Sequence, residues 1–262
     1  MPLQLPSILE KFQEKVEATQ NHTIRIKPSA QAPVYLWQSK IGGKPYWPKD
    51  MAYPKSAQGE FLFFLAQFNF AEIPPLEGFP SKGILQFFIA ADGMYGLDFD
   101  NPQAQNGFRV VYHPEILEDS AVLESDFAFL PPFDDDTPLP QNASFALNFS
   151  LEEEWLGPPD YQFDQVYPET FLAGFGEEQE EVMDFFYELG SKSSGHKLGG
   201  YAFFTQYDPR DPAVPMQLLF QMDSDSDIDT MWGDMGIANF FISQDDLKAL
   251  RFDRVLYNWD CA

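Results

Sequence analysis

Residues 83–92, GILQFFIAAD, recur at residues 236–245 as GIANFFISQD, with six of the ten positions identical. Three shorter stretches recur in the same order: KIGG at 40–43 as KLGG at 197–200, LAQFN at 65–69 as LFQMD at 219–223, and RVVY at 109–112 as RVLY at 254–257. Self-similarity in a fixed order indicates a repeated structural unit. The sequence therefore predicts an internal duplication, with repeat units at residues 40–113 and 197–258.

The repeated stretches have the composition of buried strands. They are short, rich in aromatic and branched residues, and bounded by Gly, Pro, Asp or Asn. Residues 61–65, FLFFL, are apolar at every position, which is typical of a strand covered on both faces. We expect a mainly β fold, α+β by helix content, in which both units share one compact body spanning residues 1–262.

Two stretches have the pattern of amphipathic helices. Ser7 and Glu10 form a capping box ahead of an apolar stripe, which predicts an N-terminal helix over residues 7–19. A second helix, over 177–189, is expected to end at Gly190 and precedes the second repeat. It belongs to an insert at residues 114–196, which also holds a strand candidate at 143–151.

Charge and cysteine content exclude several classes of partner. The chain has 262 residues, and 16 Lys and Arg against 41 Asp and Glu give a net charge of −25 at pH 7. That charge repels nucleic acid and anionic membranes, so we expect neither as a partner. No apolar run is long enough to span a bilayer, no signal peptide is recognisable, and Cys261 is the single cysteine. The expected location is the cytoplasm.

Several short motifs carry a resemblance to a known family. They are GGKPYWP at 42–48, LAQFN at 65–69, LGGY at 198–201, QMDSD at 221–225, MWGD at 231–234 and NWDC at 258–261. In combination, over residues 37–261, the chain resembles the YwqG-like family of uncharacterised bacterial proteins. The resemblance implies a soluble, mainly β bacterial protein. It supplies no catalytic or ligand-binding residues.

Residues 223–229, DSDSDID, have the spacing of a cation-binding loop. The acids Asp223, Asp225, Asp227, Asp229 and Asp234 match positions 1, 3, 5, 7 and 12 of a calcium loop. Ile228 stands where that loop needs Gly, and position 12 is Asp rather than Glu. Two interpretations stay open, a solvated acidic loop or a Ca or Mg site. The acidic run at residues 134–136 has weaker spacing, and there we expect a solvated surface.

Polar residues recur at matching places inside the apolar strands. Gln67 corresponds to Gln221, and Asn69 corresponds to Asp223. A buried amide without a partner costs about 1 to 3 kcal/mol, so these groups must be paired or must line a cavity. One interpretation is a structural hydrogen bond that both repeats need. The other is a small-ligand cleft between the repeats, lined by Gln67, Asn69, Gln221 and Trp232.

A Pro-rich stretch holds four large aromatic residues. Trp37, Tyr46, Trp47 and Tyr53 could form an exposed groove for an extended or Pro-rich peptide. They could equally close one end of a β core.

Two classes of function remain after these exclusions. The first is a non-catalytic acidic binding or interaction module, whose partner is a basic protein or a small ligand. The alternative is a divalent-metal-dependent hydrolase with Asp223, Asp225 and Asp234 as metal ligands. The sequence leaves the catalytic residues, the ligand and the oligomeric state open.

Overall fold

A single ten-stranded antiparallel sheet dominates the computed structural model, which describes residues 3–133 and 136–262. Asp134 and Asp135 of the acidic run lie outside the described residues. The strand order is β10-β9-β8-β7-β1-β6-β2-β3-β4-β5. The strands are β1 (Asn21–Pro28), β2 (Lys40–Gly42), β3 (Phe63–Asn69), β4 (Ile84–Ile89), β5 (Phe108–His113), β6 (Ser144–Glu154), β7 (Lys197–Gly199), β8 (Gln217–Asp223), β9 (Ile237–Ile242) and β10 (Leu256–Asp260). The expected mainly β fold is confirmed.

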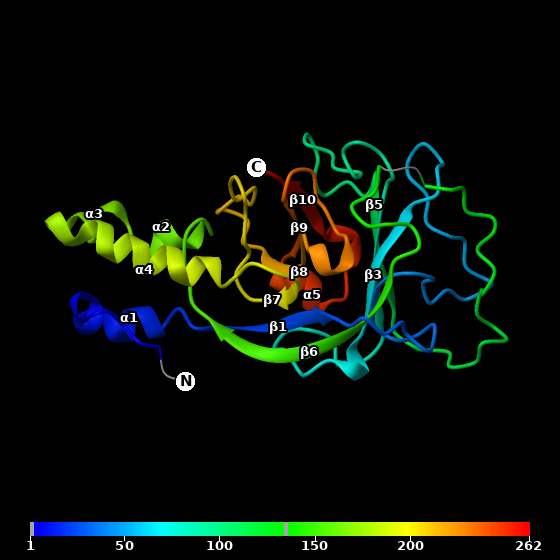
Figure 1. Cartoon of the computed structure of the whole chain (residues 1–262), viewed down its shortest axis with the longest axis horizontal. Helices are drawn as coiled ribbons and strands as arrows, with labels where there is room; N and C mark the ends of the chain where they lie inside the picture. The colour runs from blue at the N-terminus through cyan, green and yellow to red at the C-terminus, as the bar shows by residue number, and fades with distance from the viewer. Residues whose placement is uncertain (1–2, 134–135) are drawn as a thin grey trace.

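The two long strands β1 and β6 pair with each other at the centre of the sheet (Figure 1). On its other edge β1 pairs with β7, and β6 pairs with β2. We call β2–β5 the first half-sheet and β7–β10 the second half-sheet. The first half-sheet is therefore bordered by β6 and the second by β1. In each case the bordering strand is the central strand that lies farther from the half-sheet along the chain.

The two half-sheets match in register. Lys40 pairs with Gln67 in the first, and Lys197 pairs with Gln221 in the second. The β3–β4 and β8–β9 ladders shift register at matching places, between Phe64 and Ala66 in one and between Leu218 and Phe220 in the other. These correspondences follow the sequence repeat, while a duplication as their origin stays a prediction.

The main core lies between the half-sheets, which face each other. The ring of Phe87 in β4 lies 4.8 Å from that of Phe220 in β8 and 4.7 Å from that of Phe240 in β9. All three side chains are fully buried. The first Phe of each repeated FF pair, Phe87 and Phe240, therefore meets its counterpart in one shared core.

Most of the helices gather at one end of the molecule around a separate apolar cluster (Figure 1). Near the N-terminus a 3₁₀ turn, Ser7–Phe12, leads into a short α1 (Gln13–Glu17), so the expected N-terminal helix is present in two pieces. The insert contributes α2 (Gln162–Val166), α3 (Glu169–Ala173) and α4 (Gln179–Ser191), and α5 (Gln244–Lys248) follows β9. No helix within the described ranges combines the length and apolarity needed to cross a bilayer.

Two local expectations about these helices are wrong. Pro6, rather than Ser7, is the N-cap of the first turn, and no side chain caps it, so the capping box does not form. Gly190 lies inside α4 instead of ending it. A Cβ atom at Gly190 would lie 2.4 Å from the carbonyl oxygen of Pro158, so glycine is required there by a close backbone approach.

Candidate functional site

The matching glutamines connect loops to the strands through their side-chain amides. Gln67 Oε1 accepts from the Tyr46 backbone N–H at 2.8 Å, and its Nε2 donates to two carbonyls, Leu36 at 2.8 Å and Gln38 at 2.7 Å. Gln221 Oε1 accepts from the Phe203 N–H at 2.8 Å. Its Nε2 donates to the carbonyls of Ser193 and Gly195, both at 2.8 Å. This geometry supports the interpretation that Gln67 and Gln221 each make structural hydrogen bonds that their own half-sheet needs.

The four residues of the expected cleft are all buried. Gln67, Gln221 and Trp232 are 0% exposed, and Asn69 is 4% exposed. The Asn69 side chain accepts from the Ala71 N–H and donates to the Trp37 carbonyl, which fixes the turn after β3. Trp232 packs edge-on against Tyr95. The three amides are thus occupied within the fold, whereas the buried Trp232 indole N–H has no hydrogen-bond partner among the described residues. A ligand cleft lined by these four side chains stays a prediction.

The acidic loop contains a partner that the sequence pattern did not indicate, His196. The His196 Nδ1 accepts from the Asp223 N–H at 3.1 Å, which leaves Nε2 to carry the proton and to donate to Asp225 Oδ2 at 3.2 Å. Asp223 Oδ2 accepts from the Gly195 N–H at 2.7 Å. Asp225 also caps the turn Ser226–Ile228 by accepting from the Asp227 N–H. His196 is 27 residues from Asp223, so no local spacing could reveal the contact.

The pKa values of the Asp223 and Asp225 carboxyls shift in opposite directions. Burial raises the pKa of Asp223 above its ordinary value. The hydrogen bond from His196 lowers the pKa of Asp225. Within the described ranges, no three His, Cys, Asp or Glu side chains lie where they could hold one metal ion. Asp227, Asp229 and Asp234 therefore do not join Asp223 and Asp225 in such a group. The arrangement supports a loop held by hydrogen bonds, and the Ca or Mg site remains a prediction.

Titration of calcium, magnesium or manganese into metal-stripped protein should give no saturable heat, because Asp223 and Asp225 already accept hydrogen bonds from the chain. Isothermal calorimetry measures this directly. The matched variants are Asp225→Asn in the loop and Asp211→Asn elsewhere on the surface. A saturable heat that disappears in Asp225→Asn and persists in Asp211→Asn would restore the metal interpretation.

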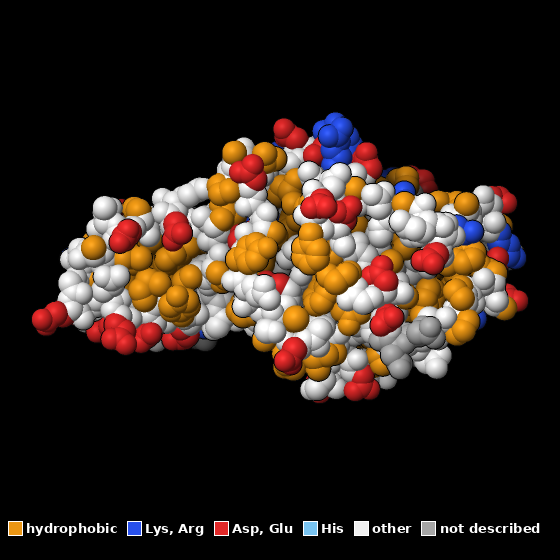
Figure 2. Space-filling model, turned by 90° about the horizontal axis from the view of Figure 1, so that it is seen from above, with side chains coloured by type: hydrophobic (Ala, Val, Ile, Leu, Met, Phe, Trp, Pro, Cys, Tyr) orange, Lys and Arg blue, Asp and Glu red, His pale blue; other side chains and the backbone are white. Residues whose placement is uncertain are grey.

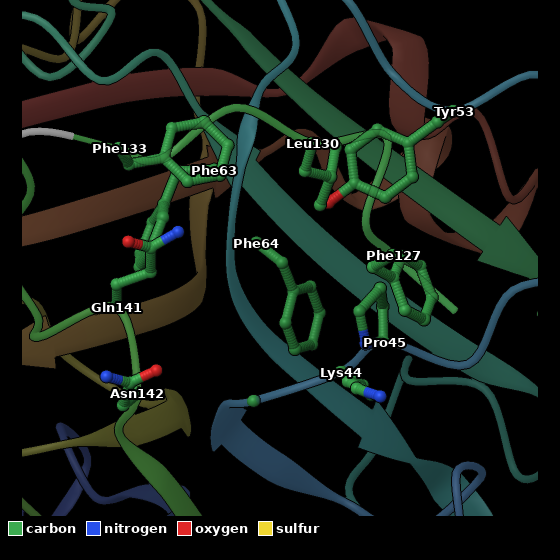
Figure 3. A pocket seen from close by; sticks show the side chains of 11 residues that line it. Lys44, Pro45, Tyr53, Phe63, Phe64, Phe127, Leu130, Phe133, Gln141 and Asn142 are labelled. Carbon is green, nitrogen blue, oxygen red and sulfur yellow. The ribbon is translucent and has the colours of Figure 1, made fainter. Parts of the chain in front are cut away.

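A pocket of about 340 Å³, which we call the aromatic pocket, lies beside the start of β3. Phe63 packs edge-on against Phe133 at 5.3 Å, and Phe64 packs against Phe88 at 5.4 Å. Eleven residues line the pocket, namely Gly43, Lys44, Pro45, Tyr53, Phe63, Phe64, Phe127, Leu130, Phe133, Gln141 and Asn142. Figure 3 shows Gln141 and Asn142 on one side of Phe64, and Lys44, Pro45 and Phe127 on the other. Five of the eleven lining residues are thus aromatic, and Lys44, Gln141 and Asn142 add polar groups.

Tyr53 is the buried polar residue of this pocket. Its ring is held by Trp47 at 5.4 Å and by Phe88 at 5.6 Å, and its hydroxyl end points inward beside Leu130 (Figure 3). The residue is 8% exposed, and its hydroxyl has no hydrogen-bond partner among the described residues. Burial raises the pKa of Tyr53, so the phenol stays protonated and able to donate.

The expected peptide groove does not form at the buried members of the Pro-rich stretch. Tyr46, Trp47 and Tyr53 are 1%, 3% and 8% exposed, so they close the end of the core as the other interpretation expected. Trp37 is partly exposed and stacks on Tyr35 at 4.9 Å. The sequence therefore pointed to the right aromatic segment, but not to the pocket that forms beside it.

Comparison with known proteins places the chain in a family. No curated protein matches the sequence. Residues 39–261, which include both half-sheets, β6 and every lining residue of the aromatic pocket, match the family described as a domain of unknown function, DUF1963. The protein therefore belongs to the DUF1963 family.

Proposed function

We propose that this protein is a non-catalytic binding protein that holds a small, largely apolar ligand in the aromatic pocket. The observation that carries the proposal is a pocket of about 340 Å³ whose wall contains the buried, unpartnered hydroxyl of Tyr53. Ligand sites in proteins are typically concavities of this kind, mostly apolar with a few placed polar groups. An unpaired buried hydroxyl costs free energy that a ligand acceptor would recover.

The chemistry of the wall supports binding rather than catalysis. Its described residues include no carboxylate, imidazole or thiol, which are the usual acids, bases and nucleophiles of enzymes. Lys44, the one ionisable amine, donates to the Ser125 carbonyl at 2.7 Å. A hydrolase would need its machinery elsewhere, and the acidic loop offers no convergent metal ligands within the described ranges.

The charge of the protein limits what it can bind. Three cations, Lys40, Lys197 and Arg210, are buried, and so are three carboxylates, Glu154, Asp160 and Asp260. The net charge of −25 therefore lies on the surface. Acidic side chains are spread over the visible face in Figure 2. An anionic ligand or partner is therefore disfavoured, and a macromolecular partner would be basic. Membership of the YwqG-like group and a cytoplasmic location remain proposals from the sequence.

A neutral fluorescent probe tests the pocket. N-phenyl-1-naphthylamine should bind with saturable fluorescence enhancement, because the aromatic wall removes its rings from water. Leu130→Trp fills the pocket and should abolish the enhancement. Leu151→Trp adds the same ring at an exposed position of β6 and should leave the enhancement unchanged. Equal enhancement in both variants, or none in the unaltered protein, would contradict the proposal.

A further inference from the structure

The two half-sheets supply a common frame in which the aromatic pocket can be compared with its counterpart. Tyr46 follows Gly43 by three residues and contacts Gln67, while Phe203 follows Gly200 by three residues and contacts Gln221. The carbonyls of these residues also accept from matching amides, Gln86 Nε2 at 2.7 Å and Asn239 Nδ2 at 2.9 Å. Positions after the two glycine pairs therefore correspond in space as well as in sequence.

In that frame Tyr53 corresponds to Arg210. Each follows the second glycine of its pair by ten residues. The Tyr53 ring lies 5.6 Å from Phe88, and the Arg210 guanidinium lies 4.7 Å from the Phe241 ring. Phe88 pairs with Phe64, and Phe241 pairs with the matching Leu218. A phenol and a guanidinium thus occupy equivalent places over equivalent rings.

The place in front of Arg210 is filled by the chain itself. Asp160 Oδ2 accepts from Arg210 Nη2 at 2.7 Å, and the Tyr161 ring stacks on the guanidinium at 4.7 Å. Both residues come from the insert between β6 and β7. The insert also packs against Tyr201, the counterpart of Lys44 at the pocket. In the second half-sheet, the side chain at this position is therefore contacted by a planar ring and by an acceptor oxygen.

In the first half-sheet the aromatic pocket lies beside Tyr53, whose ring is contacted by Phe127 at 6.1 Å and by Phe129 at 5.6 Å. Resting on the proposed binding function, we propose that the pocket binds a neutral planar aromatic ligand bearing a carbonyl-type acceptor oxygen, which accepts a hydrogen bond from the Tyr53 hydroxyl. The ligand ring packs against the aromatic residues of the wall, and its acceptor oxygen has the role at Tyr53 that Asp160 has at Arg210.

The difference between the two donors explains why the acceptor is neutral. Arg210 is a cation and is matched by the carboxylates of Asp160 and Asp208. Tyr53 donates without carrying a charge, and its burial would penalise a carboxylate brought against it. The net charge of −25 disfavours an anionic ligand further. The side-chain amides of Gln141 and Asn142, across the pocket, can serve further polar groups of the ligand.

Three probes of similar size separate the ring from the acceptor. Benzamide has both, toluene has the ring alone, and cyclohexanecarboxamide has the acceptor on a non-planar ring. Ligand-observed NMR titration should rank benzamide first. Tyr53→Phe should weaken benzamide about tenfold, which is the factor that one neutral hydrogen bond contributes, and should leave toluene unchanged. The matched control is Tyr187→Phe, which removes a hydroxyl from an exposed residue of α4 and should change neither.

Tyr53→Phe should also fold, because it removes a hydroxyl that has no partner among the described residues. Its melting temperature without ligand should equal or exceed that of the unaltered protein. Equal benzamide affinity in Tyr53→Phe, or equal binding of cyclohexanecarboxamide, would overturn the inference. The binding function itself would still stand if N-phenyl-1-naphthylamine bound and Leu130→Trp abolished that binding. Loss of probe binding would remove both.

Discussion

Replacing Glu154 with glutamine should lower the free energy of unfolding by about 3 to 5 kcal/mol, because it leaves the Lys197 cation buried without a counter-charge. The Lys197 Nζ lies 2.9 Å from both carboxylate oxygens of Glu154. The two side chains are 0% and 2% exposed, so water cannot replace the lost partner. Urea unfolding at neutral pH measures the loss.

The matched control is the exposed pair Lys82 and Glu115, whose side chains are 68% and 80% exposed. Glu115→Gln should cost less than about 1 kcal/mol. A similar small cost for Glu154→Gln would show that the buried pair adds nothing beyond a surface contact.

The penalty of Glu154→Gln should shrink as the pH rises. Burial lowers the pKa of Lys197 to about 8, and Glu154 opposes that shift. Without Glu154 the pKa falls further, so the folded variant releases the proton at a lower pH. The unfolded chain then binds more protons than the folded variant, and the stability of the variant rises with pH. The penalty measured at pH 9 should be smaller than that at pH 6.

Truncating Phe87 to alanine should cost about 3 to 5 kcal/mol, the usual range for deleting a large ring from a core. Phe87 contacts Phe220 and Phe240 of the other half-sheet at 4.8 and 4.7 Å. Because these contacts join the half-sheets, we expect the loss to be shared by both. Amide hydrogen exchange of β3–β5 and β8–β10 should accelerate by the same factor, with one cooperative unfolding transition.

The control for Phe87→Ala is Phe99→Ala, at a side chain that is 71% exposed. It should change stability by less than about 0.5 kcal/mol. If Phe87→Ala accelerated exchange in β3–β5 alone, the expectation of one shared body over residues 1–262 would be wrong.

Strands could be predicted from the sequence where a local pattern determines them. The stretch at residues 83–92 contains β4, and the one at 236–245 contains β9, because aromatic and branched residues between glycine and aspartate suit a buried strand. Gly190 misled the helix prediction because its role is a close approach to Pro158, which is distant in the chain. Local rules cannot detect a requirement that tertiary packing imposes.

The aromatic pocket lay beyond sequence reasoning for the same reason. Its wall brings together Lys44, Tyr53, Phe63, Phe127 and Gln141, which share no spacing. The pairing of matching glutamines could be anticipated, because the repeat placed Gln67 and Gln221 in one register. His196 could not be assigned to the acidic loop, because nothing local distinguishes a histidine 27 residues from its partner.

The pairing of each half-sheet with a central strand that is distant along the chain has a consequence for synthesis on the ribosome. The first half-sheet is bordered by the start of β6, where Ser144 to Ala146 pair with β2, so the edge of β2 stays open until Ala146 has emerged. Strand β1 is made first and meets β7 only some 170 residues later. An open strand edge invites pairing with other nascent chains. Ribosome pausing before Ala146 has emerged would therefore prolong the period in which nascent chains on one messenger can pair wrongly.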